Sequence, residues 1–270
     1  ALPIYHLMNR GADRQDIFST DDDRLVFERQ LGEIVAAGQL EIHAYVLMGS
    51  HYHLLGRSPR GEVSSAMHRL GSEYARWYNQ RHRRDGPLFR NRFVSVPVRS
   101  DVQALVVARY IHRNPLAIVP ERALDAYRWS SLGLYTQRRA PVDWVRRDVI
   151  GALAGDADAH LEFVHSAHPS DDDHACWAPF RPPVELDDIA RVLAAITGSD
   201  PTSSDVRGRR RSDGFVALVT LAVEFRVESA EHLAARLGLP SPGAVRTVAR
   251  RGRVRLVDDG GFARLCGAVR

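Results

Sequence analysis

The sequence has no lysine, so its 37 basic residues other than histidine are all arginine. Its two cysteines, Cys176 and Cys266, lack the close spacing of a zinc or redox motif and define no disulfide framework. The longest strongly apolar run, Phe215 to Val223, is far shorter than the ~20 residues that span a bilayer, and the N-terminus does not resemble a signal peptide. These absences predict a soluble cytoplasmic protein with no membrane partner.

Positive charge is concentrated towards the two ends of the chain. Residues 1–150 carry 22 arginines against 16 acidic residues, and residues 207–270 carry 13 against 6. Residues 151–206, in contrast, carry 2 arginines and 11 acidic residues. Clustered positive charge attracts phosphate backbones, whereas an acidic segment is typical of a solvated connector. The pattern therefore favours a nucleic-acid partner and association with the nucleoid.

Hydrophobic periodicity predicts alternating strands and helices in the first part of the chain. The strands are expected at residues 4–9, 42–48, 51–55 and 92–98, and the helices at residues 21–38, 63–78 and 101–114. Gly49-Ser50 is expected to form a type II′ hairpin turn, and Pro97 predicts an edge strand. This order is typical of an α+β fold with a central antiparallel sheet and helices on one face. Residues 144–164 are expected to be weakly helical.

The chain is predicted to contain a first domain at residues 1–165, a linker at 166–183 and a small all-α domain at 184–270. The linker is rich in Asp, His and Pro. Helical patterns follow at residues 186–196, 215–225, 229–237 and 241–251. The last two are separated by a short turn, which is a helix-turn-helix signature.

Two histidines, His51 and His53, flank one bulky residue on the third expected strand. Because side chains alternate along a strand, both imidazoles face the same side of the sheet, where they can reach one metal ion. The alternative is a pair of half-buried histidines on a hairpin that bind no metal.

Tyr110 and Asn114 lie four residues apart on the last expected helix of the first domain, so they share one face. A phenol has a pKa of ~10 and is a poor nucleophile at neutral pH. A divalent cation held by the two histidines and Asn114 could polarise a phosphate for in-line attack, and this mixed ligand set suits Mg²⁺ or Mn²⁺. Taken alone, Tyr110 could equally be a core aromatic and Asn114 a helix-end residue.

Several motifs in the same order resemble single-tyrosine HUH transposases, in particular the REP-associated tyrosine transposases. They are Tyr5–Gly11, Gln15–Phe18, His43–Met48, His51–Leu55, Gly86–Phe93, Tyr110–Pro115 and Tyr127–Ser131. The resemblance covers about residues 1–165. It implies a ferredoxin-like HUH domain with Tyr110 as nucleophile, His51 and His53 as metal ligands, and Asn114 as the third ligand. It also implies single-stranded DNA substrates, often with hairpins from palindromic repeats. Gly49-Ser50 departs from the usual Pro-Asn, which changes the turn and leaves the ligands in place.

Arginines in both domains are predicted to bind DNA, because arginine binds phosphates bidentately. They are Arg81, Arg83, Arg84, Arg90 and Arg92 in the first domain, and Arg209, Arg210, Arg211, Arg246 and Arg250 in the second. Tyr74, Trp77 and Tyr78 could stack bases, but they fall on an apolar helical stripe and are interpreted as core. Residues 184–256 resemble the duplex-binding domain of the bacterial replication initiator. A helical accessory domain without a DNA role is the alternative.

These observations predict a metal-dependent enzyme that cleaves and transfers single-stranded or hairpin DNA through a 5′-phosphotyrosine. Flanking duplex DNA is a further expected partner, and the protein would act as a monomer or homodimer. Two alternatives are a domesticated protein that binds repeat hairpins without cutting, and a metal hydrolase that activates water. The intact tyrosine and histidine pair argue against the first, and a covalent protein–DNA adduct would exclude the second.

Overall fold

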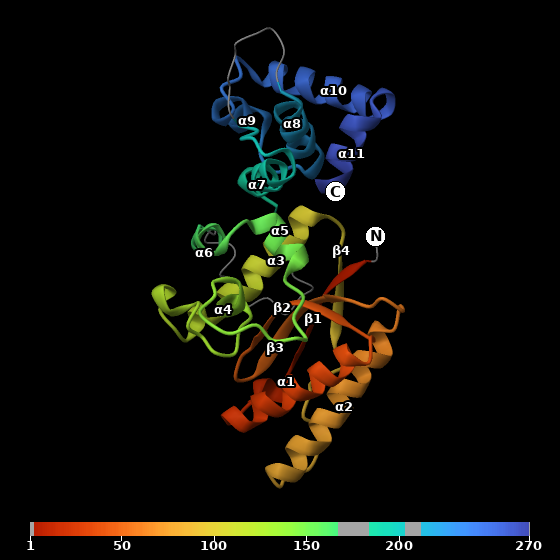
Figure 1. Ribbon diagram of the computed structural model, residues 1–270, viewed down its shortest axis with the longest axis vertical. Coiled ribbons are helices and arrows are strands. Elements are labelled where there is room, and N and C mark those ends of the chain that lie inside the picture. Colours follow the sequence, from red (N-terminus) through yellow and green to blue (C-terminus); the bar gives the residue numbers. More distant parts are fainter. Residues whose placement is uncertain (1–2, 167–183, 203–211, 270) are drawn as a thin grey trace. The chain divides into compact units, whose positions relative to one another are not determined.

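The computed structural model describes residues 3–166, 184–202 and 212–269 and divides into two compact units (Figure 1). The first unit contains residues up to 99, 107–151 and the stretch that begins at 156. The second contains residues 100–106, 152–155 and the C-terminal helices. All strands of the described residues lie in the first unit, so the predicted α+β fold with a following helical region is confirmed.

The elements up to residue 165 follow the order β1-α1-β2-β3-α2-β4-α3, with shorter helices after them. The strands are β1 (Ile4–Arg10), β2 (Glu41–Leu47), β3 (His51–Arg57) and β4 (Val94–Val98). The helices are α1 (Asp21–Ala36), α2 (Val63–Arg81), α3 (Asp101–Arg113), α4 (Leu132–Tyr135), α5 (Asp148–Ala154) and α6 (Ala157–His165).

The sheet has the strand order β2-β3-β1-β4, and every pairing is antiparallel. Together with the order of the helices, this is the ferredoxin-like arrangement. β4 lies at the edge, which confirms the expectation from Pro97. In the central pair, Met8 of β1 lies opposite His53 of β3, and Arg10 lies opposite His51. This register determines which side chains share each face.

One face of the sheet packs on α1 and α2, which lie side by side in Figure 1. Leu7, Tyr52 and Leu54 from the strands form one core cluster with residues of both helices, Tyr74 among them. Tyr74 and Tyr78 are buried, and Trp77 packs against the same cluster. The interpretation of these three aromatics as core residues is therefore confirmed.

The turn between β2 and β3 differs from the expected type II′ turn. That type needs a positive φ at its first central residue, and Gly49 is not among the glycines with positive φ. The Gly49 carbonyl instead accepts hydrogen bonds from the backbone N–H groups of Ile17 and Phe18. A Cβ at Gly49 would lie 2.9 Å from Asp16 Oδ1. The loop before α1 thus approaches Gly49 closely through both its backbone and the Asp16 side chain.

Residues 144–164 form two short helices preceded by a turn and an isolated β-bridge. Val145 makes a parallel bridge to Ile42, and Trp144 packs on Tyr45 with ring centroids 4.9 Å apart. Gly155, with a φ of 90°, separates α5 from α6. The expected helical character is confirmed over residues 148–165, whereas Trp144 and Val145 lie before the first of these helices and pack on the sheet.

The second unit contains α7 (Leu186–Thr197), α8 (Asp213–Phe225), α9 (Ala230–Arg236), α10 (Pro242–Asp258) and α11 (Gly260–Val269). Ser229 caps α9 by accepting from His232 N, and Ser241 caps α10 by accepting from Ala244 N. α10 runs beyond its predicted end, and α11 was not predicted. Within the described ranges, no helix combines the length and apolar character needed to cross a bilayer.

α8 and α10 pack closely at Gly252, where a Cβ would lie 1.9 Å from Thr220 Oγ1. We expect Gly252→Ala to destabilise the protein by about 1–3 kcal/mol, because the added methyl group must push the helices apart. Urea denaturation measures the change in unfolding free energy.

Gly267→Ala in α11 is the matched control, because no atom lies within 4 Å of its Cβ position. This helical substitution should be neutral or stabilising by up to about 1 kcal/mol. Equal effects of the two substitutions would contradict the close packing at Gly252.

Candidate functional site

The alternation of β3 separates its side chains between the two faces of the sheet. His51 and His53 share one face, and their ring centroids are 5.3 Å apart. Tyr52 faces the core and packs on Phe27, with centroids 4.9 Å apart. The histidine pair therefore lies on the face that α1 and α2 leave uncovered.

The C-terminal end of α3 brings Tyr110 and Asn114 to this histidine pair. The Tyr110 ring lies edge-on to His53, with centroids 5.5 Å apart and an interplanar angle of 86°. Asn114 follows the last residue of α3, and its Oδ1 lies 3.2 Å from His51 Nε2. Asn114 Nδ2 also donates to the Tyr110 carbonyl at 3.3 Å. All four residues singled out from the sequence thus meet on one face of the sheet.

A further histidine, His6 on β1, belongs to the same cluster and was missed by the sequence analysis. Its Nε2 lies 2.9 Å from His53 Nδ1, and its ring centroid is 5.8 Å from that of Tyr110. The side chain is 0% exposed, and this burial lowers the pKa of His6 to about 3. The ring is therefore neutral at physiological pH. Its alternating position on a strand was a usable signal, but only the strand order shows that β1 lies beside β3.

Arg10 was also missed, and it shares the face of the histidine pair because it lies opposite His51 across β1 and β3. It is 8% exposed. Burial lowers the pKa of Arg10, and the positive charges of Arg14 and Arg90 lower it further. Grouped guanidinium charges at this end of the sheet create a positive potential that favours a bound anion.

The donor atoms fit a divalent cation. Imidazole nitrogens and an amide oxygen are ligands that divalent cations accept, and a 3.2 Å hydrogen bond brings His51 Nε2 and Asn114 Oδ1 together. Within the described residues no three His, Cys, Asp or Glu side chains form a metal cluster. A cation here would thus be held by two imidazoles and one amide oxygen, with positions left for oxygens from a substrate.

Comparison with known proteins bears on this part of the chain. Residues 2–114 match the family model described as "Transposase IS200 like". This segment is therefore similar in sequence to IS200-like transposases. The match runs from β1 to the residue after α3, so the matched segment includes His6, His51, His53, Tyr110 and Asn114.

Among solved structures, the chain is similar to one titled "Structure of the REP associates tyrosine transposase bound to a REP hairpin". The two share 18% sequence identity with a TM-score of 0.43, and the alignment covers 58% of this chain and 87% of the other. A comparison with curated proteins gives no significant match.

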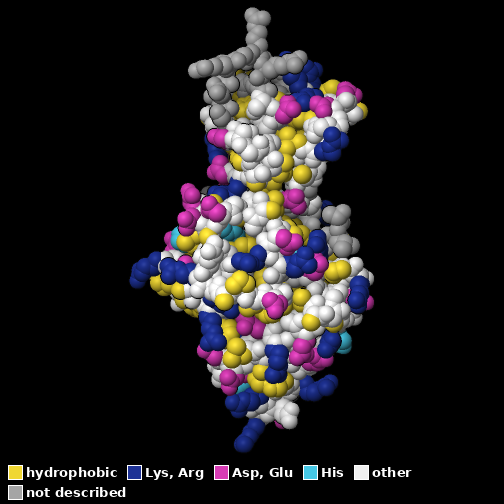
Figure 2. Space-filling view, viewed as in Figure 1, with side chains coloured by type: hydrophobic (Ala, Val, Ile, Leu, Met, Phe, Trp, Pro, Cys, Tyr) yellow, Lys and Arg dark blue, Asp and Glu magenta, His cyan; other side chains and the backbone are white. Residues whose placement is uncertain are grey.

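The predicted DNA-binding arginines of the first unit lie at the end of α2 and in the loop that follows it. Arg81, Arg83, Arg90 and Arg92 are exposed, and basic side chains are prominent on the face shown in Figure 2. Arg84 differs, because it is partly buried and donates to Gln15 Oε1 at 2.5 Å.

Hydrogen bonds connect the same loop to the end of β1 and to the residues that follow it. Gln15 Nε2 donates to the Leu88 carbonyl at 2.9 Å, and Arg90 N donates to the Arg10 carbonyl at 3.0 Å. Asn9 Nδ2 donates to the Asn91 carbonyl at 3.2 Å. The arginine loop is therefore held next to the strand end that carries Arg10 and pairs with His51.

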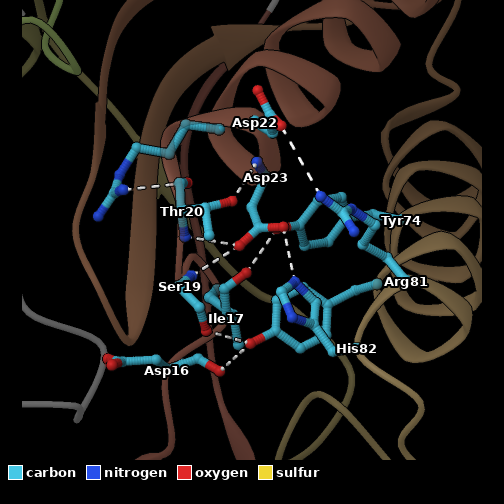
Figure 3. A network of polar contacts seen from close by, with 11 residues as sticks. Asp16, Ile17, Ser19, Thr20, Asp22, Asp23, Tyr74, Arg81 and His82 are labelled. Carbon is cyan, nitrogen blue, oxygen red and sulfur yellow. Dashed lines mark hydrogen bonds and ion pairs between the residues drawn. The ribbon is translucent and has the colours of Figure 1, made fainter.

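A buried network holds the start of α1 against the end of α2, where the arginine loop begins (Figure 3). The Asp23 carboxylate is fully buried and accepts from Ser19 N, Thr20 N and His82 Nε2 at 2.7–2.8 Å. The Tyr74 hydroxyl donates to the Ile17 carbonyl at 2.5 Å. These bonds connect the loop before α1 to both helices.

In the helical unit, the exposed side of α10 carries Arg246 and Arg250, one turn apart. Arg255 has a different environment, because it donates to Asp213 and Asp259. The predicted basic loop of Arg209, Arg210 and Arg211, and almost all of the predicted linker, lie outside the described residues.

We expect Asp23→Ala to destabilise the first unit by about 2–3 kcal/mol, because it removes a buried carboxylate and leaves its donors unpaired. Asp22→Ala is the control, since Asp22 lies in the same turn, is exposed and makes only a 4.0 Å ion pair with Arg81. It should cost less than about 1 kcal/mol. Urea denaturation followed by circular dichroism measures both, and similar losses would contradict the role given to the buried network.

Proposed function

We propose that this protein is a metal-dependent DNA strand transferase in which Tyr110 attacks a backbone phosphate of single-stranded or hairpin DNA. The observation that carries the proposal is the cluster at the end of α3. There the Tyr110 ring packs on His53 while Asn114 Oδ1 lies 3.2 Å from His51 Nε2. The match of residues 2–114 to the IS200-like transposase family model supports this chemistry.

The proposed reaction exchanges one phosphodiester bond for another. Tyr110 Oη forms a bond to phosphorus while the bond from phosphorus to the 3′-oxygen breaks. The phenol proton passes to solvent, and the leaving 3′-oxygen takes a proton from solvent. The products are a 5′-phosphotyrosine and a free 3′-hydroxyl, and attack by a 3′-hydroxyl of another strand reverses the step and joins the strands.

The residues around Tyr110 would supply the electrostatics that a phenol needs. His51, His53 and Asn114 would hold Mg²⁺ or Mn²⁺, which when bound neutralises charge on the phosphate oxygens. Tyr110 is 4% exposed, so the phosphate has to be guided to a small accessible part of its side chain. Arg10, on the same face as His51, is placed to bind a neighbouring phosphate oxygen.

DNA outside the reacting phosphate would contact the exposed arginines. Arg83, Arg90 and Arg92 of the loop after α2 would bind the single strand, with Arg81 beside them. Arg84 would hold this loop in place through Gln15. Arg246 and Arg250 on α10 would bind flanking duplex, because a helix with two arginines one turn apart can follow a phosphate backbone.

The proposal predicts a covalent adduct between protein and DNA. A hairpin oligonucleotide labelled at its 3′ end and incubated with Mn²⁺ should give labelled protein on a denaturing gel, because the tyrosine keeps the 5′-phosphate of that fragment. Label at the 5′ end should appear in a shorter free strand. Tyr110→Phe should abolish both products.

Tyr5→Phe is the matched control, since Tyr5 lies on the opposite face of the sheet and packs against the core. It should leave adduct formation unchanged. Cleavage that survives in Tyr110→Phe without an adduct would identify a hydrolase that activates water. Hairpin binding without cleavage in Mg²⁺ or Mn²⁺ would identify a binding protein instead.

A second prediction concerns the helical unit. Replacing Arg246 and Arg250 together by glutamine should weaken duplex binding. It should lower the slope of log K against log salt by up to about 1.8, since each neutralised phosphate contributes about 0.9. Arg264→Gln on α11 is the control, because Arg264 is also exposed but lies on another helix. Fluorescence anisotropy across a salt series measures the slope, and an unchanged slope would exclude α10 from the duplex interface.

A further inference from the structure

His6 is a buried polar residue that the proposed attack by Tyr110 does not use. It lies on β1 with no exposed surface, and its Nε2 is hydrogen-bonded to His53 Nδ1 at 2.9 Å. Its Nδ1 is buried, and no described residue bonds it. A buried nitrogen left without a partner costs about 1–3 kcal/mol. The bond to His53 offsets this cost, so the pairing of the two buried rings calls for an explanation.

The bond between the two rings determines which nitrogen of His53 is available. A hydrogen bond between two neutral imidazoles contains one proton, so one ring donates and the other accepts. If His53 Nδ1 donates, His53 Nε2 has no proton and can bind a cation. If His6 donates, the proton of neutral His53 is on Nε2, which then cannot be a ligand.

We propose that His6 is a positioning residue that accepts the hydrogen bond from His53 Nδ1 and so presents His53 Nε2 to the divalent cation. This inference rests on the metal site of the proposed function. Histidine ligands in metal sites generally donate their second nitrogen to an acceptor, and loss of that acceptor weakens metal binding about 10–100-fold. Here a second histidine takes the place of the usual carboxylate or carbonyl.

The tertiary structure places His6 within hydrogen-bond distance of His53. His53 is itself buried, at 3% exposure, so water has little access to its ring. The ring of Tyr110 packs on both histidines, and His6 approaches from the neighbouring strand. Any change at His6 therefore also alters the packing of Tyr110, which is why metal binding is a cleaner measurement than DNA cleavage.

The test compares His6→Leu with His6→Gln in the full chain, using Mn²⁺ alone and isothermal titration calorimetry. Leucine removes the acceptor, so Mn²⁺ affinity should fall about 10–100-fold. Glutamine can place its carbonyl oxygen near the former Nε2, so affinity should stay within a few-fold of the unsubstituted protein. Urea denaturation of the same variants measures stability separately. Leucine removes the partner of His53 Nδ1 and glutamine leaves its own buried amide N–H groups unpaired, so the two variants should lose similar stability.

If His6 only supports the fold, the loss of Mn²⁺ affinity in the two variants should parallel their loss of unfolding free energy. This result would overturn the proposal. Equal Mn²⁺ affinity in His6→Leu and the unsubstituted protein would also overturn the proposal, but the metal site of the proposed function would then stand. Failure of the unsubstituted protein to bind Mn²⁺ would instead remove the metal site itself. A nitrogen-15 spectrum of the Mg²⁺-saturated protein provides a direct measurement: a proton on His53 Nδ1 supports the proposal, and a proton on Nε2 refutes it.

Discussion

The antiparallel pairing of β1 with β3 is the constraint on which the candidate site depends. Its register sets Met8 opposite His53 and Arg10 opposite His51, and alternation then sends Tyr52 to the opposite face. A shift of one residue in β3 would move both imidazoles into the apolar core and Tyr52 out of it. The apolar side chains that α1 and α2 bury therefore also determine where the histidines point.

The end of α3 completes the cluster because the chain cannot continue as a regular helix there. Pro115 has no N–H to donate and interrupts the helical hydrogen bonds, and residues 114–117 form a 3₁₀ turn. The Asn114 amide is held at both ends: Nδ2 donates to the Tyr110 carbonyl, while Oδ1 lies near His51 Nε2. The amide orientation is thus set by the same helix that carries the tyrosine.

Arginine has two separate roles in this lysine-free chain. Arg84 and Arg255 donate to Gln15 and to two aspartates, so their planar guanidinium groups fix local structure. Exposed arginines of the loop after α2 and of α10 instead project from the surface. Arg10 combines burial with nearby positive charge, an arrangement suited to an anion beside the histidine pair.

The sequence by itself determined the order of strands and helices, the common face of His51 and His53, and the pairing of Tyr110 with Asn114. These features follow from alternation along a strand and from helical spacing, which are local properties of the backbone. Only the tertiary structure decided that His6 and Arg10 lie beside the histidine pair and that Gly49 meets the loop before α1. Those contacts join residues far apart in the chain, because they depend on which strands become neighbours once the core is buried.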